Sequence, residues 1–231
     1  QQTEAQPGIG FQRSNELIKP LHDALPFELT TAQARVLREI FSDMTSERRM
    51  NRLLQGDVGS GKTVVALFSM LLALESGYQA ALMAPTEILA EQHARKLGHL
   101  LGDLGLEVLL LTGRLTAGKR NHALEKLASG EARVVVGTHA LIQEGVDFHR
   151  LGLVVVDEQH RFGVRQRMVL GEQESRPDVL VMSATPIPRS MAMALYGDLD
   201  LSILDELPPG RKPVVTQLRT PRERKAVYRF L

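Results

Sequence analysis

Residues 56–63 of the 231-residue chain read Gly56-Asp57-Val58-Gly59-Ser60-Gly61-Lys62-Thr63. These glycines, followed directly by Lys and Thr, match the phosphate-binding loop pattern, which requires a strand before it and a helix after it. Glycines let backbone N–H groups converge on phosphate oxygens at the positive end of a helix. We expect Lys62 to reach the β- and γ-phosphates and Thr63 to offer its hydroxyl to Mg²⁺. The alternative is a glycine-rich turn that only caps a helix.

The sequence on both sides of this loop alternates short runs rich in Val and Leu with longer segments of helical period. The runs predict strands at Arg52–Gln55, Gln79–Ala84, Leu106–Leu111, Arg133–Gly137, Leu153–Asp157 and Val179–Ser183. Helices are expected at Thr31–Met44, Lys62–Ser76, Glu87–Leu101 and Ala117–Ser129. Most of the strand runs are continuously apolar, as in a parallel sheet that is covered on both faces. The pattern therefore predicts an α/β fold with a mainly parallel sheet, helices on both faces and ligands at the carboxyl ends of the strands.

The composition excludes several classes of protein. Apolar residues make up 43% and charged residues 24% of the chain, close to globular averages, and the formal charge is only +1. The absence of cysteine excludes disulfides, thiolate metal sites and Cys nucleophiles, and it fits a cytoplasmic protein. The longest apolar stretch, Val64–Leu74, is far shorter than the roughly 20 residues of a membrane-spanning helix. We expect no membrane partner.

A second chemical motif follows a buried strand at Asp157 and Glu158. A phosphate-binding loop needs a carboxylate for its metal, so Asp157 is expected in the Mg²⁺ shell, while Glu158 is placed to orient or deprotonate the attacking water. The catalytic set is thus Lys62, Asp157 and Glu158. The alternative is an ordinary polar loop after a strand. None of the seven histidines has metal-binding spacing, which leaves competing hydrolytic chemistries without support.

With these motifs in place, nearly the whole chain resembles the first motor domain of a superfamily 2 helicase. Residues 157–160 resemble the DExH box, Ser183-Ala184-Thr185 the motif that links hydrolysis to strand movement, and residues 84–92 the first nucleic-acid-contacting motif. The segments DEQHRFG from Asp157, SATPIPR from Ser183 and DELPPGRKP from Asp205 resemble RecG-type branched-DNA helicases. Transcription-repair coupling factors share the HRFG and ATPIPR parts of these segments, but usually read DEEH in the box, where this chain has Gln159.

The resemblance implies a RecA-like domain that uses ATP and Mg²⁺ to translocate on DNA and to remodel stalled forks and Holliday junctions. It also implies two partners within the same polypeptide, a wedge domain and a second motor domain. We expect an N-terminal linker over residues 1–25, the first motor domain over 26–207, and a linker with the start of the second motor domain over 208–231, including a strand at Pro213–Leu218. The sequence opens without Met and stops inside an expected helix, so we expect a piece of a longer protein that is weakly active or inactive alone.

Four residues are candidate DNA contacts because they follow strand ends and can face one phosphate track. They are Thr86, Thr112, Gly113 and Thr138. Helix capping is the alternative for Thr86 and Thr138. Coupling residues are expected at His160, Ser183 and Thr185, because the strand that ends at Ser183 should neighbour the strand that bears Asp157.

Gln33 has two competing roles. In superfamily 2 motors a Gln upstream of the phosphate-binding loop reads adenine, and residues 27–33 resemble that motif. The same Gln lies three residues after Thr30 and can complete a capping box instead. The proposed nucleotide-binding set is therefore Gln33, Gly56, Gly59, Ser60, Gly61, Lys62 and Thr63.

Three functions of different classes remain open from the sequence. The RecG-type motor half is favoured. A coupling-factor-like translocase or another P-loop ATPase is the second class, although no transporter signature Leu-Ser-Gly-Gly-Gln is present. A nucleotide-gated DNA-binding module without unwinding activity is the third.

Overall fold

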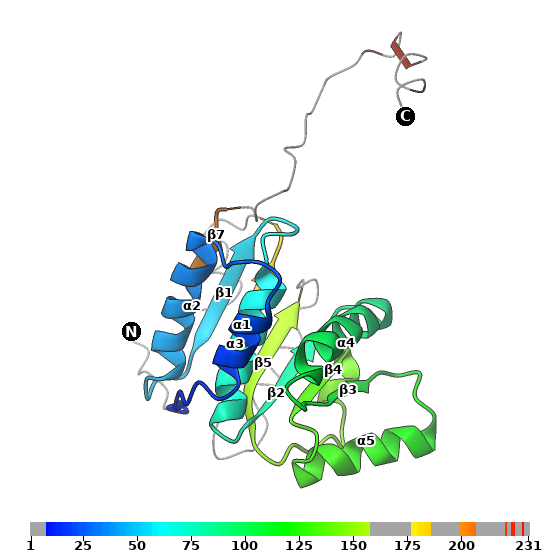
Figure 1. Ribbon diagram of the computed structural model, residues 1–231. Helices are drawn as coiled ribbons and strands as arrows, with labels where there is room; N and C mark the ends of the chain where they lie inside the picture. The colour runs from blue at the N-terminus through cyan, green and yellow to red at the C-terminus, as the bar shows by residue number, and fades with distance from the viewer. Residues whose placement is uncertain are drawn as a thin grey trace, which may run out of the picture.

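A parallel β-sheet forms the centre of the molecule (Figure 1). The computed structural model describes residues 8–157, 177–185 and 199–206, with residues 220, 223, 224 and 228 near the C-terminus. The strands are β1 (Asn51–Gly56), β2 (Gln79–Met83), β3 (Val108–Leu111), β4 (Val134–Gly137), β5 (Leu151–Asp157), β6 (Asp178–Ser183) and β7 (Asp200–Leu204). Their order is β3-β4-β2-β5-β6-β1-β7, and each neighbouring pair is parallel. The mainly parallel sheet expected from the sequence is confirmed.

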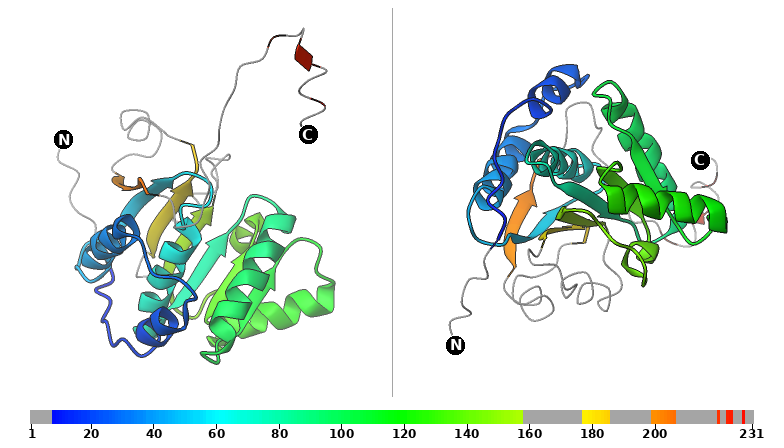
Figure 2. Two further views of the ribbon diagram at one scale, coloured as in Figure 1. Left: turned by 45° about the horizontal axis from the view of Figure 1, so that its top comes forward. Right: turned by 90° about the horizontal axis from the view of Figure 1, so that it is seen from below.

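Helices cover both faces of this sheet (Figure 2). They are α1 (Ile18–Ala24), α2 (Thr31–Met44), α3 (Lys62–Glu75), α4 (Glu87–Gly102), α5 (Ala117–Ser129) and the 3₁₀ helix η1 (His139–Ile142). The first four bury their apolar residues in one core with alternate strand residues such as Leu82 and Val155. Helix α5 and η1 pack with the strand residues of opposite orientation, such as Ala81 and Val154, in a second core.

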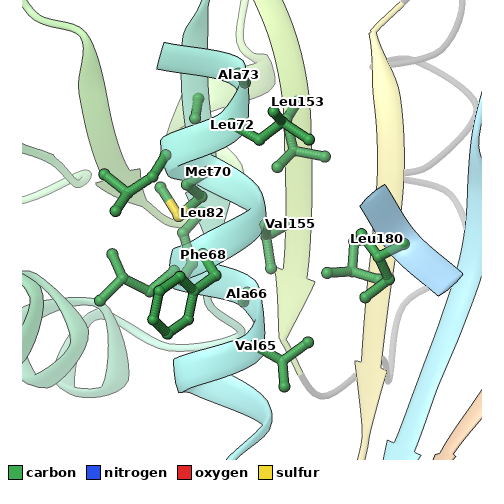
Figure 3. Close-up of a cluster of buried hydrophobic side chains, with 14 of the residues drawn as sticks. Val65, Ala66, Phe68, Met70, Leu72, Ala73, Leu82, Leu153, Val155 and Leu180 are labelled. Carbon is green, nitrogen blue, oxygen red and sulfur yellow. The ribbon is translucent and has the colours of Figure 1, made fainter. Parts of the chain in front are cut away.

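Helix α3 is the most deeply buried helix of the described chain (Figure 3). Every residue from Val64 to Leu74 is buried, including Ser69, whose hydroxyl donates to the Val65 carbonyl at 2.9 Å. A helix that is apolar all round is stable only where neighbours surround it. The apolar stretch that is too short for a membrane therefore serves as the centre of the larger core. No helix among the residues described is long and apolar enough to cross a membrane.

The expected linker at the N-terminus contains ordered structure from residue 8 onward. Ile9, Phe11, Ile18 and Leu21 are buried against the larger core. We call residues 8–17 the N-terminal arm; it leads into α1. The sequence did not predict this packing because the arm has no helical or alternating period, and only two residues of α1 are buried. The domain boundary itself stays a prediction.

Strand β7 was also not predicted. It lies at the sheet edge beside β1, and its mixed burial and Asp and Ser residues do not form an apolar run. The expected strand at Pro213–Leu218 and the boundary near Pro208 lie outside the described residues.

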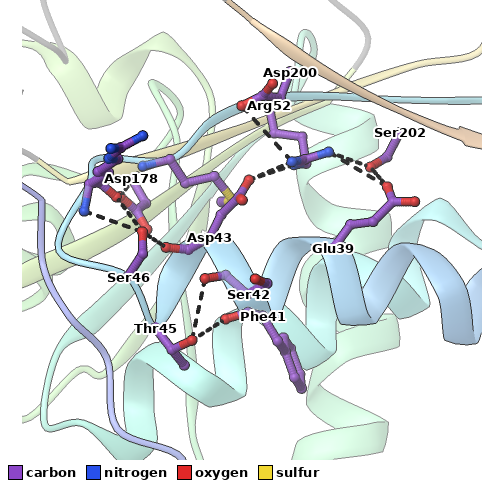
Figure 4. Close-up of polar contacts among 12 residues, drawn as sticks. Glu39, Phe41, Ser42, Asp43, Thr45, Ser46, Arg52, Asp178, Asp200 and Ser202 are labelled. Atoms are coloured by element: carbon purple, nitrogen blue, oxygen red, sulfur yellow. Dashed lines mark hydrogen bonds and ion pairs between the residues drawn. The ribbon is translucent and has the colours of Figure 1, made fainter. Parts of the chain in front are cut away.

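A polar network holds the amino-terminal edge of the sheet (Figure 4). Arg52 of β1, which is 8% exposed, donates to the Asp43 carboxylate at 2.6 Å and to the Ser202 hydroxyl at 2.8 Å. Ser202 in turn donates to Glu39. Because Asp43 and Glu39 belong to α2 and Ser202 to β7, the guanidinium fastens one helix and two strands together.

Candidate functional site

The phosphate-binding loop and Asp157 lie at the same edge of the sheet. The loop joins the end of β1 to the start of α3, and Asp157 is the last residue of β5. Strand β6 runs between β1 and β5 and places Ser183 beside Gln55 and Met182 beside Asp157. The sheet order thus brings three sequence motifs together at its carboxyl edge, where ligands of open α/β sheets bind.

The glycines of the loop are required by its shape. Gly59 and Gly61 adopt φ angles of 83° and 93°, in the left-handed region that L side chains avoid. A Cβ on Gly61 would lie 2.1 Å from the Gln33 amide nitrogen, and one on Gly56 would lie 2.5 Å from the Ser60 hydroxyl. The backbone can therefore form a close cradle only with glycine at these positions.

Two further observations show that this cradle fits a polyphosphate. Helix α3 begins at Lys62 without a side-chain cap, so the positive end of its dipole is available to an anion. The Ser60 hydroxyl is buried and has no hydrogen-bond partner among the described residues. An unsatisfied buried hydroxyl costs free energy that a phosphate oxygen would recover.

Lys62 lies inside the loop. Its Nζ donates to the carbonyl oxygens of Gly56 at 2.7 Å and Asp57 at 3.0 Å. These bonds hold the ammonium group against the loop backbone.

The oxygen ligands present also fit Mg²⁺ bound together with a nucleotide. The described residues contain no cluster of three His, Asp or Glu side chains that could form an all-protein metal cage. Mg²⁺ in phosphoryl-transfer sites usually takes only one or two protein oxygens, with phosphates and water supplying the rest. Asp157 and the Thr63 hydroxyl, both at this edge, are oxygen donors of that kind.

Gln33 forms the capping box, and also contacts the loop. Its side-chain oxygen accepts from the Thr30 backbone N–H at 3.0 Å, while the Gln33 backbone N–H donates to the Thr30 hydroxyl at 3.2 Å. Its Nε2 donates to the Ser60 carbonyl at 2.9 Å, and the residue is 2% exposed. The capping box that the spacing of Thr30 and Gln33 allowed is therefore present. Adenine recognition by Gln33 stays a prediction.

His93 is a site residue that sequence reasoning missed. Its Nε2 lies 2.6 Å from Oδ2 of Asp157, and both side chains are 13% exposed. The two residues are 64 positions apart, so no local motif signals the contact. Only the packing of α4 against the sheet reveals it.

The expected neighbour relation of the coupling motif is confirmed, since β6 pairs with β5. The Ser183 and Thr185 hydroxyls lie 3.0 Å apart, and the Thr185 N–H donates to the Ser183 hydroxyl at 3.2 Å. Glu158 and His160 lie outside the described residues, so their expected roles stay predictions.

The candidate DNA contacts follow three neighbouring strands, in the order β3-β4-β2. Thr86 and Gly113 are exposed, whereas Thr112 and Thr138 are 4% and 2% exposed. The Thr86 hydroxyl accepts from the Leu89 N–H at 3.3 Å and caps α4, while the Thr138 hydroxyl accepts from the Ala140 N–H at 3.5 Å. Capping is therefore present at both threonines. Thr86 and Gly113 are therefore the solvent-accessible members of the set, and DNA contact stays a prediction for all four residues.

The chain belongs to the DEAD/DEAH box helicase family, whose sequence profile it matches over residues 30–194. Within that family its similarity is to RecG. It is 56% identical, over 91% of its length, to the ATP-dependent DNA helicase RecG of Streptococcus pneumoniae, and 54% identical over 92% to that of Bacillus subtilis. It covers 31% of each of these relatives.

Solved structures agree with this similarity. The structure of RecG bound to a three-way DNA junction superposes with a TM-score of 0.87 at 49% identity, covering 97% of this chain and 30% of that one. The helicase MrfA bound to DNA superposes with a TM-score of 0.66 at 18% identity, covering 96% of this chain and 36% of that one, which shows a shared fold. The RecG-type resemblance and the RecA-like fold expected from the sequence are thereby confirmed.

Proposed function

We propose that this chain is the ATP-binding first motor domain of a DNA helicase that remodels branched DNA such as stalled forks and Holliday junctions. The observation that carries the proposal is the meeting of the glycine cradle, Asp157 and the Ser183–Thr185 motif at one sheet edge. The RecG relatives, at more than 50% identity, support this function over a coupling-factor-like translocase. A three-way junction is the ligand in the solved RecG structure, and we extend branched DNA to this protein as its substrate.

Each group at this edge has a role in the proposed reaction. The uncapped start of α3, Lys62 and the Ser60 hydroxyl bind the phosphates and orient them. Thr63 and Asp157 would hold Mg²⁺, which would supply positive charge beside the phosphates when bound. Glu158 orients the attacking water and accepts its proton. Ser183 and Thr185 couple ATP hydrolysis at the site to movement along the DNA strand.

The remaining assignments belong to the same proposal. Gln33 recognises adenine, and Thr86, Thr112, Gly113 and Thr138 contact the DNA backbone. The wedge domain and the second motor domain are further parts of the full-length protein, and the protein acts in the cytoplasm.

Two variants of the full-length protein test the catalytic assignment. Lys62→Ala should weaken ATP binding and reduce turnover by about 10²-fold or more, because the phosphates lose their cation. Glu158→Gln should bind ATP as before and lose hydrolysis, because only the water loses its base. Nucleotide binding and single-turnover hydrolysis measure both effects, and Lys119→Ala, at an exposed position on α5, is the control. Equal loss of affinity in both variants would contradict the role of Glu158. Single-turnover hydrolysis absent from the unmutated protein would favour a nucleotide-gated binding module.

A further inference from the structure

The contact between His93 and Asp157 joins α4, which begins at the proposed DNA edge, to β5, which bears the proposed metal ligand. Strand β2 pairs with β5, with Met83 beside Val156, so α4, which begins four residues after Met83, starts next to the end of β5. His93 lies in the second turn of α4 and reaches Asp157 across the sheet edge (the helix is labelled in Figure 1).

The geometry of this contact is that of a strong hydrogen bond. The Nε2–H group of His93 donates to Oδ2 of Asp157 over 2.6 Å. Bonds from an N–H to an ionised carboxylate are shorter and stronger than neutral ones, and both side chains here are largely withdrawn from water. A carboxylate held by one oxygen has a fixed rotamer and still presents its other oxygen, Oδ1.

Helix α4 does not need this bond for its packing. Ala90, Leu97 and Leu101 are buried in the larger core and fasten the helix along its length. Its start is capped by Thr86. Because these apolar residues and the cap secure α4 without the His93 bond, the orientation of the His93 ring toward Asp157 calls for another explanation.

We propose that His93 is a positioning residue that holds the Asp157 carboxylate in place for the metal and ties it to α4. Groups that orient metal ligands by hydrogen bonds typically change metal affinity 10- to 100-fold when removed. Because Thr86 caps the start of α4, this one helix then connects the proposed DNA edge with the metal side of the nucleotide site. The inference rests on the proposed function, since it assumes that Asp157 serves Mg²⁺.

The test is the Mg²⁺ concentration at which the full-length protein half-saturates with a fluorescent, non-hydrolysable ATP analogue. His93→Ala should raise this concentration about 10-fold, with nucleotide affinity in the absence of Mg²⁺ unchanged. His93→Gln keeps an N–H donor and should restore most of the effect. His99→Ala, at an exposed position on the same helix, should behave as the unmutated protein. A merely structural His93 would instead lower the melting temperature and weaken binding equally with and without Mg²⁺.

Asp157→Ala separates this inference from the function on which it rests. An unchanged Mg²⁺ requirement in His93→Ala, alongside a raised one in Asp157→Ala, would overturn the role of His93 alone. An unchanged requirement in both would overturn the metal assignment of Asp157 and the inference with it. If His93→Ala fails to fold, His93→Phe takes its place, because it keeps a ring of similar size and removes the N–H donor. An unaltered Mg²⁺ requirement in His93→Phe would contradict the proposal.

Discussion

Gln33 uses both ends of its amide, and this links the start of α2 to the phosphate-binding loop. Its oxygen accepts from Thr30, and its Nε2 donates to Ser60. The capping box follows from the spacing of Thr30 and Gln33 in the sequence. The bond to Ser60 spans 27 positions and is visible only in the fold.

We expect Gln33→Ala to lower the free energy of unfolding by about 1 kcal/mol, the usual value of a helix cap. We also expect it to reduce selectivity for ATP over GTP, because the amide accepts from the N6 amine of adenine and donates to N7, whereas its C=O would face the O6 acceptor of guanine. Gln33→Glu is the matched variant, since a carboxylate keeps the acceptor of the capping box and removes the NH₂ donor. Competition binding of ATP and GTP, with denaturation of the same proteins, measures both effects. Unaltered selectivity in both variants would leave Gln33 with its structural role alone.

Asp178 is a buried acid at the amino end of β6. It is 0% exposed; Oδ1 accepts from the Met50 N–H at 2.8 Å, and Oδ2 has no partner among the described residues. Burial raises its pKa from 3.8 to about 8, against the effects of the Met50 N–H and the Arg49 charge, and Asp43 raises it further.

A raised pKa in the folded state means that the folded chain keeps a proton that the unfolded chain releases. Stability should therefore fall as pH rises from about 4 to about 8, by up to about 1.4 kcal/mol per pH unit from this group. Asp178→Asn should remove this decline and raise stability at neutral pH. Denaturant unfolding at pH 5, 6.5 and 8 checks this, and an equal slope in both proteins would contradict it.

At the scale of the elements, one carboxylate binds the second half of the N-terminal arm, while Gly8, Phe11 and Gln12 of the first half bond to other residues. Glu75, at the end of α3, accepts from the backbone N–H groups of Ser14, Asn15, Leu17 and Ile18 at 2.8–3.0 Å. Burial of this carboxyl raises its pKa, but the four N–H bonds outweigh that effect and the pKa lies below its ordinary value. The carboxylate thereby satisfies the N–H groups at the start of α1, which has no side-chain cap from its own N-cap residue.

We expect Glu75→Gln to loosen the arm, because a neutral amide offers one acceptor oxygen in place of two charged ones. The loss should be about 1 kcal/mol, the net value of an ordinary hydrogen bond, because these bonds lie at or near the surface. Hydrogen exchange at residues 14–18 should accelerate, while exchange in β2 stays as in the unmutated protein. Glu125→Gln, on the exposed face of α5, is the control. Unchanged protection of residues 14–18 would show that the Glu75 carboxylate does not hold the arm.

Most of the elements can be predicted from the sequence because their apolar period is strong. Helices α2 and α5 have the predicted bounds, and α3, α4 and the first six strands differ from prediction by a few residues at their ends. Helix α1 and β7 are different, because each is stabilised by contacts with distant residues: α1 by Glu75, and β7 by pairing with β1. The local periodicity of a sequence cannot predict contacts between residues that are far apart along the chain.

In the whole molecule, the residues that stabilise the fold and the residues of the candidate site lie at opposite edges of the sheet. The Arg52 network and Asp178 lie at the amino edge, and the loop, Asp157 and Ser183 lie at the carboxyl edge. The parallel order of the strands makes this separation predictable, since all of their carboxyl ends meet at one edge. The pairing of His93 with Asp157 was not predictable, because it depends on how α4 packs across that edge.

We expect this sheet edge to belong to a motor that acts on branched DNA. The most direct test is the ATPase rate of the full-length protein with forked DNA, linear duplex DNA and RNA, compared at equal nucleotide concentration and salt, because phosphate contacts depend on salt. Lys62→Ala supplies the background rate. Forked DNA should stimulate hydrolysis most. Equal stimulation by RNA would contradict the account.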